Sequence, residues 1–188
     1  MGHAIRNPRS GSLRTPEESG PKIAALGGTF DMLHEGHKRL ITRAFEIADI
    51  VFIGVTGDSL VSGLRKGHRV RPYAYRSRKL RSFLKSEGWL SRARIVELKD
   101  PFGLAARRRR LDALVVSQET YRAGLRLNSL RRRRGLRPVR LYVVRLVKAQ
   151  DGLPITSTRI RQGEIDSEGT LTPKLGCRLR IGSPRSLA

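Results

Sequence analysis

Short runs of Val, Ile, Leu and Ala recur along the chain, separated by longer segments in which polar and apolar residues are mixed. The runs show no strict alternation of polar and apolar positions, which is typical of parallel strands buried on both faces. We therefore expect one sheet of buried parallel strands. The predicted strands are Ile23–Leu26, Ile50–Val55, Ile95–Leu98, Leu111–Val116 and Val139–Leu146.

The segments between these runs are long enough for amphipathic helices. Helices are expected over His37–Ile47, Tyr73–Lys85 and Thr120–Arg134. Strands that alternate with helices predict an α/β protein with a Rossmann-like, doubly wound parallel sheet. Such sheets bind ligands at the carboxyl ends of their strands, so functional residues are expected at that edge.

The two ends of the chain differ in composition from its middle. Residues 1–20 are rich in Gly, Ser, Pro and Arg without periodicity, which predicts a disordered tail. Residues 171–188 form a second basic tail that contains no acidic residue. We expect one domain over residues 21–170, in keeping with a length of 188 residues.

Targeting and membrane segments are not apparent. The first residues lack the apolar stretch of a signal peptide, which predicts a cytoplasmic protein. The longest apolar stretch, Ile47–Val55, is too short for a membrane span and is interrupted by Asp49. The single cysteine, Cys177, excludes an intrachain disulfide and a multi-cysteine zinc site.

The formal charge of +23, from 39 basic and 16 acidic residues, is high. It would suit a nucleic-acid-binding protein, and it would equally help an enzyme to gather anionic substrates. Genome composition or a hot habitat can also favour arginine. Charge alone leaves these alternatives open.

Two arginine runs have structural interpretations. Arg131–Arg134 closes a predicted helix just before Gly135, where cations complement the helix dipole and glycine fits a left-handed cap. Arg107–Arg110 precedes a predicted strand and is expected to form a solvated loop or helix end. We interpret both runs as solvated faces, with nucleic-acid contact as the alternative.

The run Gly27–His37, GGTFDMLHEGH, follows the first predicted strand and leads into a helix. Paired glycines let the backbone approach a ligand closely, and the start of a helix offers unpaired N–H groups to a phosphate. His34 and His37 lie three residues apart at this start, so both imidazoles can turn toward one anion. There, protonated or hydrogen-bonded, they can stabilise charge that develops on a phosphate oxygen.

Other motifs of similar appearance fail on spacing. The run contains neither GxxxxGK[ST] nor GxGxxG, which excludes a P-loop and a dinucleotide fingerprint. The zinc motif HExxH begins at His34 and Glu35, but its second ligand is replaced by Lys38. A polar turn that merely caps a helix remains the structural alternative, although it does not explain why strand, glycine pair and histidine pair occur together.

A second motif, PITSTRIR over Pro154–Arg161, places three hydroxyl residues in a row before a helix. An N-cap needs only one hydroxyl, so the others can bind a ligand. On a helix, Arg161 shares a face with Ser157 and Thr158, whereas Arg159 points elsewhere. Hydroxyls beside an arginine form a second phosphate cradle. Capping alone would explain this segment equally well, but its pairing with the first motif favours phosphate.

Together the two motifs resemble those of the HxGH nucleotidyltransferases, HxGH near the N-terminus and ISSTxxR near the C-terminus. Here they read HEGH over residues 34–37 and ITSTRIR over residues 155–161. From about residue 22 to 173 the chain is similar to pantetheine-phosphate adenylyltransferases of the archaeal and eukaryotic type. The matching segments are GGTFDMLHEGHKRLITRAFE, VFIGVTGDSL, RKGHRVRPYAYRSRKLRSFL, ELKDPFG, LDALVVSQET and DGLPITSTRIRQGEID.

This resemblance implies transfer of the adenylyl group of ATP to 4′-phosphopantetheine, giving dephospho-coenzyme A and pyrophosphate. Mg²⁺ is expected to arrive with ATP, and no dedicated protein site for a metal is expected. In this family the acceptor phosphate attacks the α-phosphate directly, without a covalent enzyme intermediate. The motifs agree with such chemistry, since they offer phosphate cradles and no activated nucleophile.

The resemblance also implies roles for individual residues. His37 is expected to stabilise the transition state, and His34 to support the nucleotide phosphates. Lys66 is expected to neutralise the acceptor phosphate or the α-phosphate, with an ordinary surface lysine as the alternative. Thr29 would also lie at the acceptor. The remaining nucleotide-binding residues would be Gly28, Thr29, Phe30, Ile155, Thr156, Ser157, Thr158 and Arg161, with Ser117, Glu119 and Asn128 against ribose or adenine.

Departures from the family pattern are modest. Thr156 replaces the first Ser of ISST, and Arg107–Arg110 replaces a more acidic or mixed stretch, which leaves the oligomeric state open. Within the superfamily, enzymes that use glycerol phosphate, nicotinamide mononucleotide or FMN as acceptors are alternatives. The cytidylyl signature RTxGISTT and the nicotinamide signature GRFQP both mismatch here. A basic nucleic-acid-binding protein is the alternative from another class, although only 5% of the residues are aromatic.

Overall fold

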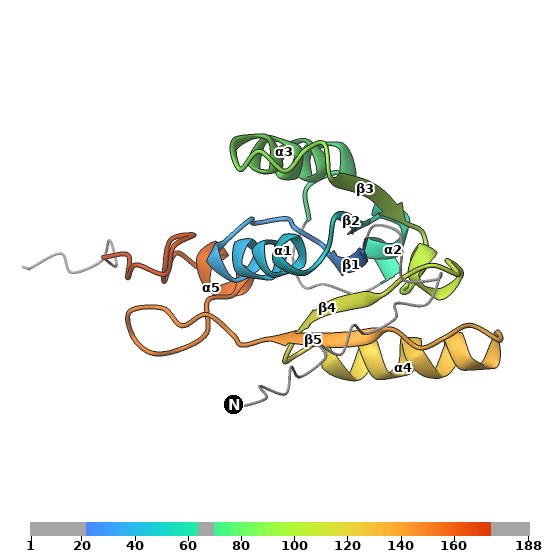
Figure 1. Ribbon diagram of the computed structural model, residues 1–188. Helices are drawn as coiled ribbons and strands as arrows, with labels where there is room; N and C mark the ends of the chain where they lie inside the picture. Colours follow the sequence, from blue (N-terminus) through green and yellow to red (C-terminus); the bar gives the residue numbers. More distant parts are fainter. Residues whose placement is uncertain (1–21, 64–69, 174–188) are drawn as a thin grey trace, which may run out of the picture.

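Five parallel strands form one sheet within the residues that the computed structural model describes, 22–63 and 70–173 (Figure 1). The strand order is β3-β2-β1-β4-β5. Each predicted strand is present, and the predicted Rossmann-like α/β fold is confirmed. The strands are β1 (Ile23–Gly28), β2 (Ile50–Thr56), β3 (Ala93–Leu98), β4 (Ala113–Ser117) and β5 (Arg140–Val144).

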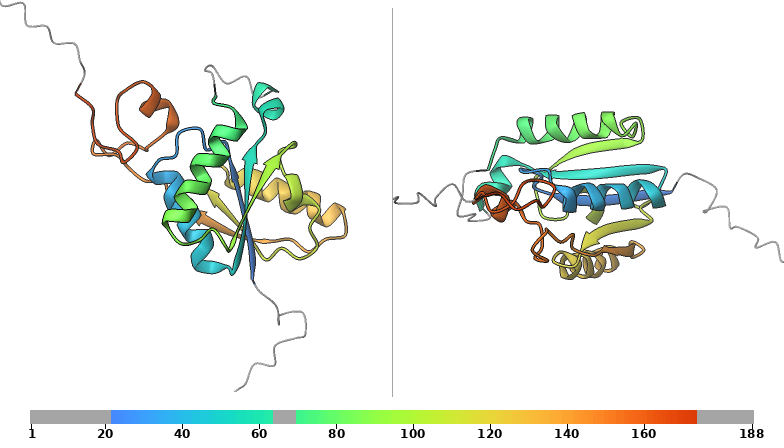
Figure 2. Two further views of the ribbon diagram at one scale, coloured as in Figure 1. Left: turned by 90° about the horizontal axis from the view of Figure 1, so that it is seen from above. Right: turned by 90° about the vertical axis from the view of Figure 1, so that its left-hand side faces the viewer.

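Helices cover both faces of the sheet (Figures 1 and 2). Two helices, α1 and α3, pack on one face, whereas α4 and the short 3₁₀ helix η2 pack on the other. The three predicted helices are confirmed, with small shifts at their ends. The helices are α1 (Glu35–Ile47), α2 (Asp58–Gly63), α3 (Tyr73–Ser86), η2 (Gly103–Ala106), α4 (Tyr121–Arg133) and α5 (Ser157–Arg161).

The central strand β1 contributes to both hydrophobic cores because its side chains alternate between the two faces. Ala24 and Leu26 belong to the cluster under α1 and α3, together with the fully buried Ile41. Ile23 and Ala25 belong to the cluster under α4 and η2. Burial of a Leu or Ile side chain contributes about 1.5–3 kcal/mol. The two clusters therefore hold β1 firmly and fix the loop that follows it.

The winding of the sheet reverses at β1, which lies between β2 and β4. Pairing with β2 continues to Gly28, opposite Val55, whereas pairing with β4 ends at Ala25, opposite Leu114. The two strands β1 and β4 therefore part toward their carboxyl ends. A reversal of this kind creates the crevice in which open α/β sheets bind ligands.

The run Arg131–Arg134 requires a correction, because Arg131 is fully buried rather than solvated. Its Nη1 donates to the carbonyl oxygens of Ala105 and Arg108 at 2.6 and 2.9 Å. Its Nε donates to the carbonyl oxygen of Arg137 at 2.8 Å. Burial lowers the pKa of Arg131. This side chain joins α4 to the segment after η2, which periodicity alone did not indicate.

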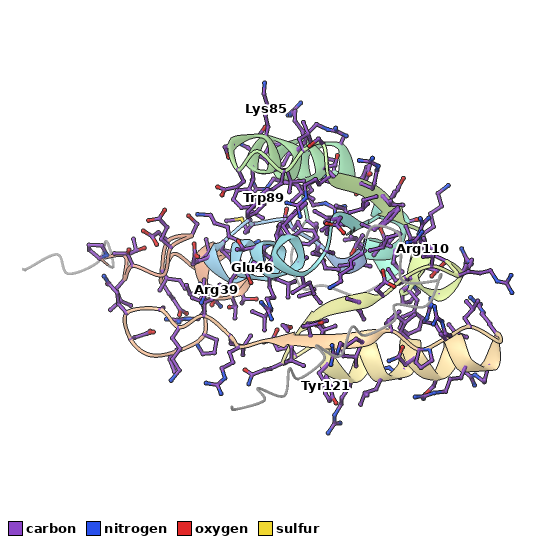
Figure 3. All side chains as sticks on the ribbon, viewed as in Figure 1. Arg39, Glu46, Lys85, Trp89, Arg110 and Tyr121 are labelled. Carbon is purple, nitrogen blue, oxygen red and sulfur yellow. The ribbon has the colours of Figure 1, made fainter. Side chains whose placement is uncertain are left out.

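The rest of the two runs lies on the surface as predicted. Arg132–Arg134 and Arg107–Arg110 are exposed, and Gly135 follows α4 with a left-handed φ of 68°. Arg110 lies at the opposite end of the molecule from α5 (Figures 1 and 3). Arg110 therefore lies far from the second motif, whereas Arg107 bonds Asp100, just after the carboxyl end of β3.

Some sequence-based predictions concern residues outside the described ranges. These are the tail over 1–20, most of the tail over 171–188, and Lys66. Among the helices of the described residues, none combines the length and the apolar character that crossing a membrane requires.

Candidate active site

The first motif forms the loop between β1 and α1. Phe30 in this loop has a φ of 51°, a left-handed conformation that costs a bulky residue about 1–2 kcal/mol. The Phe30 ring is buried, and a Cβ on Gly28 would lie 3.1 Å from its Cζ. Glycine at position 28 therefore lets the ring turn inward beneath the loop. Backbone strain of this kind is concentrated at functional sites.

His37 lies in the first turn of α1, where two neighbours position its ring. Nδ1 is 3.1 Å from the carbonyl oxygen of Met32, and the ring centroid is 5.1 Å from that of Phe30. Because a carbonyl oxygen only accepts hydrogen bonds, Nδ1 carries a proton. Nε2 of His37 is then a donor only when the ring is an imidazolium. A donor at Nε2 is what stabilisation of a phosphate oxygen requires.

His34 is the N-cap residue of α1, and only 7% of it is exposed. Its ring packs on that of His37 with the centroids 3.9 Å apart. Burial, assisted by the charge of His37, lowers the pKa of His34 to about 3. His34 is therefore neutral at neutral pH and can serve a ligand through hydrogen bonds. Its buried Nδ1 has no hydrogen-bond partner within the described ranges.

Gly36, between the two histidines, has a steric role. A Cβ at this position would lie 3.1 Å from both Cε1 and Nδ1 of His34. It would also lie 3.9 Å from the carbonyl oxygen of Ile155, in the second motif. A side chain at position 36 would therefore displace the His34 ring.

The second motif opens α5. Thr156 is its N-cap, and the Thr156 hydroxyl accepts a hydrogen bond from the backbone N–H of Arg159 at 3.3 Å. The Arg159 side chain donates to Glu164 at 2.9 Å and also bonds Asp151. Arg159 therefore braces its own segment and points away from the first motif, as helical spacing predicts. With Thr156 as the cap, the hydroxyl of Ser157 is not needed for capping.

Arg161 leaves α5 on the opposite side and reaches the first motif. Its Nη2 donates to Oδ2 of Asp31 at 2.5 Å, across 130 positions of sequence. The backbone N–H of Glu35, at the start of α1, donates to the carbonyl oxygen of Ser167 at 2.9 Å. Figure 1 shows α5 beside the start of α1. The two motifs therefore converge as predicted.

A cavity of about 230 Å³ opens in the crevice between the motifs. Its walls come from the end of β1, the start of α1, the turn after β4, and the chain from the end of β5 to α5. Most of the predicted nucleotide-binding residues line it. The lining residues are Gly27, Gly28, His34, Gly36, His37, Leu40, Ser117, Glu119, Thr120, Val144, Arg145, Leu146, Val147, Ile155, Thr156 and Ser157.

The turn after β4 is held by two hydroxyl residues. The Thr120 hydroxyl accepts a hydrogen bond from the backbone N–H of Ser117 at 3.0 Å and lies 3.1 Å from the Ser117 hydroxyl. This turn brings Glu119 to the cavity wall. Ser117 and Glu119 were predicted at the site, whereas Thr120 was missed. The signal that could have found Thr120 is a hydroxyl residue at the very start of a predicted helix, Thr120–Arg134, directly after a predicted strand and turn.

Asn128 is a correction to the predicted site. Its Nδ2 donates to the carbonyl oxygen of Val139 at 2.9 Å, and its Oδ1 accepts from the Val139 N–H at 2.8 Å. The side chain is buried and both ends of its amide are used. Asn128 therefore joins α4 to the start of β5, and we withdraw it from the nucleotide-binding residues.

Several other predicted residues lie beside the cavity rather than in its wall. Phe30 is buried under His37, and the Thr29 carbonyl oxygen accepts a hydrogen bond from Arg76 at 2.9 Å. Thr158 and Arg161 lie within α5. Asp31, Arg71 and Arg145 were not predicted at the site. A carboxylate inside a phosphate-binding motif was the signal for Asp31, and no comparable signal marked the arginines.

A second cavity, of about 280 Å³, lies on the face of the sheet that carries α4 and η2. Its walls are mainly apolar and include Phe52, Leu98 and Leu114. Both cavities are lined by Gly27, Gly28 and Thr120. The paired glycines therefore lie where a mainly apolar cavity adjoins one with more polar walls. Within the described part of the chain, no group of three or more His, Cys, Asp or Glu could hold a metal ion.

Comparison with known proteins indicates the family to which this chain belongs. The sequence profile of the Cytidylyltransferase-like family matches residues 25–163. The phosphopantetheine adenylyltransferase of Methanosarcina mazei is 42% identical over 154 residues, which cover 80% of this chain and 97% of that protein. This chain belongs to the phosphopantetheine adenylyltransferase family. A further member of the family, from Methanothermobacter thermautotrophicus, is 37% identical over 158 residues, 84% of this chain and 94% of its own.

Solved structures share the fold of this phosphopantetheine adenylyltransferase family member. A protein of unknown function from Archaeoglobus fulgidus is 34% identical, with a TM-score of 0.59 over 65% of this chain and 88% of that chain. A lipopolysaccharide core biosynthesis protein from Thermoplasma volcanium is 18% identical, with a TM-score of 0.54 over 66% and 97% of the two chains. The second likeness concerns the fold alone. The family membership makes this chain a nucleotidyltransferase.

Proposed function

We propose that this enzyme transfers the adenylyl group of ATP to 4′-phosphopantetheine, forming dephospho-coenzyme A and pyrophosphate in coenzyme A biosynthesis. The observation that carries the proposal is the meeting of two distant motifs, in which Arg161 bonds Asp31 and the residues His37 and Ser157 share one cavity. The relatives named phosphopantetheine adenylyltransferase support the choice of acceptor.

ATP binds in the polar cavity between the motifs. Its triphosphate lies between the two histidines and α5, where Ser157, Thr158 and Arg161 hold the β- and γ-phosphates. The ribose and base lie against the turn after β4, at Ser117 and Glu119, which line this cavity. Mg²⁺ enters as part of the substrate, bound to the triphosphate.

The acceptor binds in the apolar cavity on the other side of the glycine pair. A pantetheine chain is uncharged and flexible, so mainly apolar walls suit it. Its phosphate lies at Gly28, which lines both cavities, beside Thr29. The acceptor phosphate and the α-phosphate of ATP then meet at the carboxyl end of β1.

The reaction is a direct displacement. An oxygen of the acceptor phosphate attacks the α-phosphorus of ATP, and the bond from that phosphorus to the oxygen of the β-phosphate breaks. Pyrophosphate leaves with the electron pair, and Arg161 neutralises its charge. His37 donates from Nε2 to an α-phosphate oxygen as charge develops there. Catalysis therefore consists of positioning and charge stabilisation.

Release of pyrophosphate from ATP and from CTP tests this function. Each nucleotide is paired with 4′-phosphopantetheine, nicotinamide mononucleotide, glycerol phosphate and FMN, and omission of the acceptor is the control. We expect rapid release only with ATP and 4′-phosphopantetheine, and dephospho-coenzyme A in equal amount. Preference for another acceptor, or for CTP, would overturn the assignment.

A further inference from the structure

A carboxylate lies between two arginines at the edge of this phosphate site. The side chain of Asp31 is only 5% exposed, and its Oδ2 accepts a hydrogen bond from Nη2 of Arg161 at 2.5 Å. Its Oδ1 accepts from the backbone N–H of Arg71 at 2.9 Å and lies 3.4 Å from Nε of Arg71. Burial raises the pKa of Asp31, but the hydrogen bonds from Arg71 and Arg161 outweigh it and hold the pKa below its ordinary value. Asp31 is therefore ionised at neutral pH.

Asp31 engages only part of the Arg161 guanidinium. Nη1 of Arg161 is buried and has no hydrogen-bond partner among the residues of the described ranges. A buried N–H without an acceptor costs about 1–3 kcal/mol, and more when it is charged. The orphaned Nη1 therefore indicates that an acceptor from outside the described residues completes this site. An anion with several oxygens, such as a triphosphate, is the chemistry that fits.

Arg71 supplies the balancing charge and is itself held in place. Its Nη1 donates to the Tyr75 hydroxyl at 2.9 Å, and its guanidinium lies 4.9 Å from the centroid of the Tyr75 ring. Its carbonyl oxygen accepts from Nε of the buried Arg76 at 2.7 Å. Two guanidiniums thus share one carboxylate, and the group keeps one net positive charge. Arg161 is anchored without losing its attraction for phosphate.

We propose that Asp31 is a positioning residue, which holds the Arg161 guanidinium in the orientation that binds the triphosphate of ATP, while Arg71 balances the carboxylate. The proposal rests on the proposed function only in taking ATP as the ligand. Asp31 acts through Arg161 and does not itself contact the substrate. The losses of MgATP affinity caused by replacing Asp31 and by replacing Arg161 are therefore not additive.

A double-mutant cycle on the full chain tests this. Asp31→Asn keeps the shape of the side chain and removes its charge, Arg161→Ala removes the guanidinium, and the third variant combines both. The measurements are the Kd of MgATP without acceptor, the KM values for both substrates, kcat and the melting temperature. We expect Asp31→Asn to weaken MgATP binding by about 10-fold, as loss of an orienting partner does elsewhere. Added to Arg161→Ala, it should weaken binding by no more than about two-fold.

Two further variants separate positioning from a general loss of structure. Glu46→Gln also removes a carboxylate that bonds an arginine, since Glu46 accepts from Arg43 at 2.8 Å on the exposed side of α1 (Figure 3). It should bind MgATP like the natural chain. Arg71→Gln keeps Asp31 and its hydrogen bond from the backbone N–H of residue 71 but removes the second guanidinium, and should weaken MgATP binding by several-fold with the acceptor KM unchanged.

Additive losses in the cycle would overturn the proposal, as would natural MgATP affinity in both Asp31→Asn and Arg71→Gln. If Asp31→Asn fails to fold, Arg71→Gln alone decides. A rise in the acceptor KM that matches the rise in the ATP KM would point to a merely structural role and also overturn it. If the enzyme bound MgATP but did not use 4′-phosphopantetheine, the proposed function would be wrong. The double-mutant cycle, measured as the Kd of MgATP, would still test the role of Asp31.

Discussion

The imidazole rings of His34 and His37 lie with their centroids 3.9 Å apart and their planes inclined by 35°. Two cationic rings at this distance would repel each other, and His34 is also buried. We therefore expect no more than one of the two rings to be protonated at a time. The lowered pKa of His34, about 3, makes it the neutral member.

This arrangement predicts a pH dependence of stability. An unfolded histidine gains a proton as the pH falls below 6.5, but folded His34 stays neutral down to about pH 3. The unfolded state therefore binds more protons in this window, and the free energy of unfolding falls by about 1.4 kcal/mol per pH unit from this residue. Above pH 6.5 the contribution is constant. Denaturant unfolding between pH 7.5 and about 4.5 measures it.

His34→Gln is the control for this prediction, since glutamine keeps hydrogen-bonding groups and does not titrate. As the pH falls, the free energy of unfolding of the natural chain should decrease more steeply than that of His34→Gln. Parallel curves for the two proteins at all pH values would show that His34 titrates normally.

Replacement of His37 should impair the chemical step. His37→Ala removes the Nε2 donor proposed to act on the α-phosphate, and we expect kcat to fall by about 10²–10³-fold, as for other lost transition-state donors. Affinity for MgATP should change much less. The pyrophosphate assay measures kcat, and circular dichroism checks the fold. Exposed Arg39 on the same helix provides the control Arg39→Ala. Near-normal turnover of His37→Ala would remove His37 from catalysis.

Gly36→Ala should lower activity without lowering stability. The new Cβ would lie 3.1 Å from the His34 ring, which must shift by a few tenths of an ångström, and we expect kcat to fall by several-fold. Alanine in place of glycine in α1 also favours the helix by about 1 kcal/mol, so the melting temperature should hold. Gly63→Ala in α2 is the matched control, because a Cβ there meets nothing within 4 Å. Equal activity of the two variants would show that position 36 tolerates a side chain.

Arg131→Ala should destabilise the fold and leave the site intact. The variant loses hydrogen bonds to the carbonyl oxygens of Ala105, Arg108 and Arg137, which then lie without their buried donor. We expect the free energy of unfolding to fall by about 2–4 kcal/mol. Exposed Arg132 gives the control, where alanine should change stability by less than about 0.5 kcal/mol. Similar stabilities would mean that Arg131 is replaceable.

The sequence predicted what depends on local pattern. Buried strands such as Ile50–Thr56 and capped helices such as α5 arise from periodicity and short-range hydrogen bonds, so both could be read from the chain. The convergence of the two motifs was also predictable. The first motif follows the carboxyl end of a predicted strand, and open α/β sheets bind ligands at that edge, so a second phosphate-binding motif was expected there too.

Long-range pairing could not be predicted in the same way. Asn128 and Arg131 have polar side chains typical of a surface or a ligand site, but each is used to bond backbone groups of another element. Asp31 bonds a residue 130 positions away, and its partners depend on how α5 is placed. Such contacts are set by tertiary packing, which local sequence patterns do not reveal.

A structure of the full chain with Mg²⁺ and α,β-methylene-ATP tests most directly whether the two motifs share one triphosphate. We predict a triphosphate in the cavity beside Gly28, with His34 and His37 on one side, and Ser157 and the Nη1 of Arg161 on the other. A nucleotide that contacts only one motif, or that occupies the apolar cavity, would contradict the proposed site.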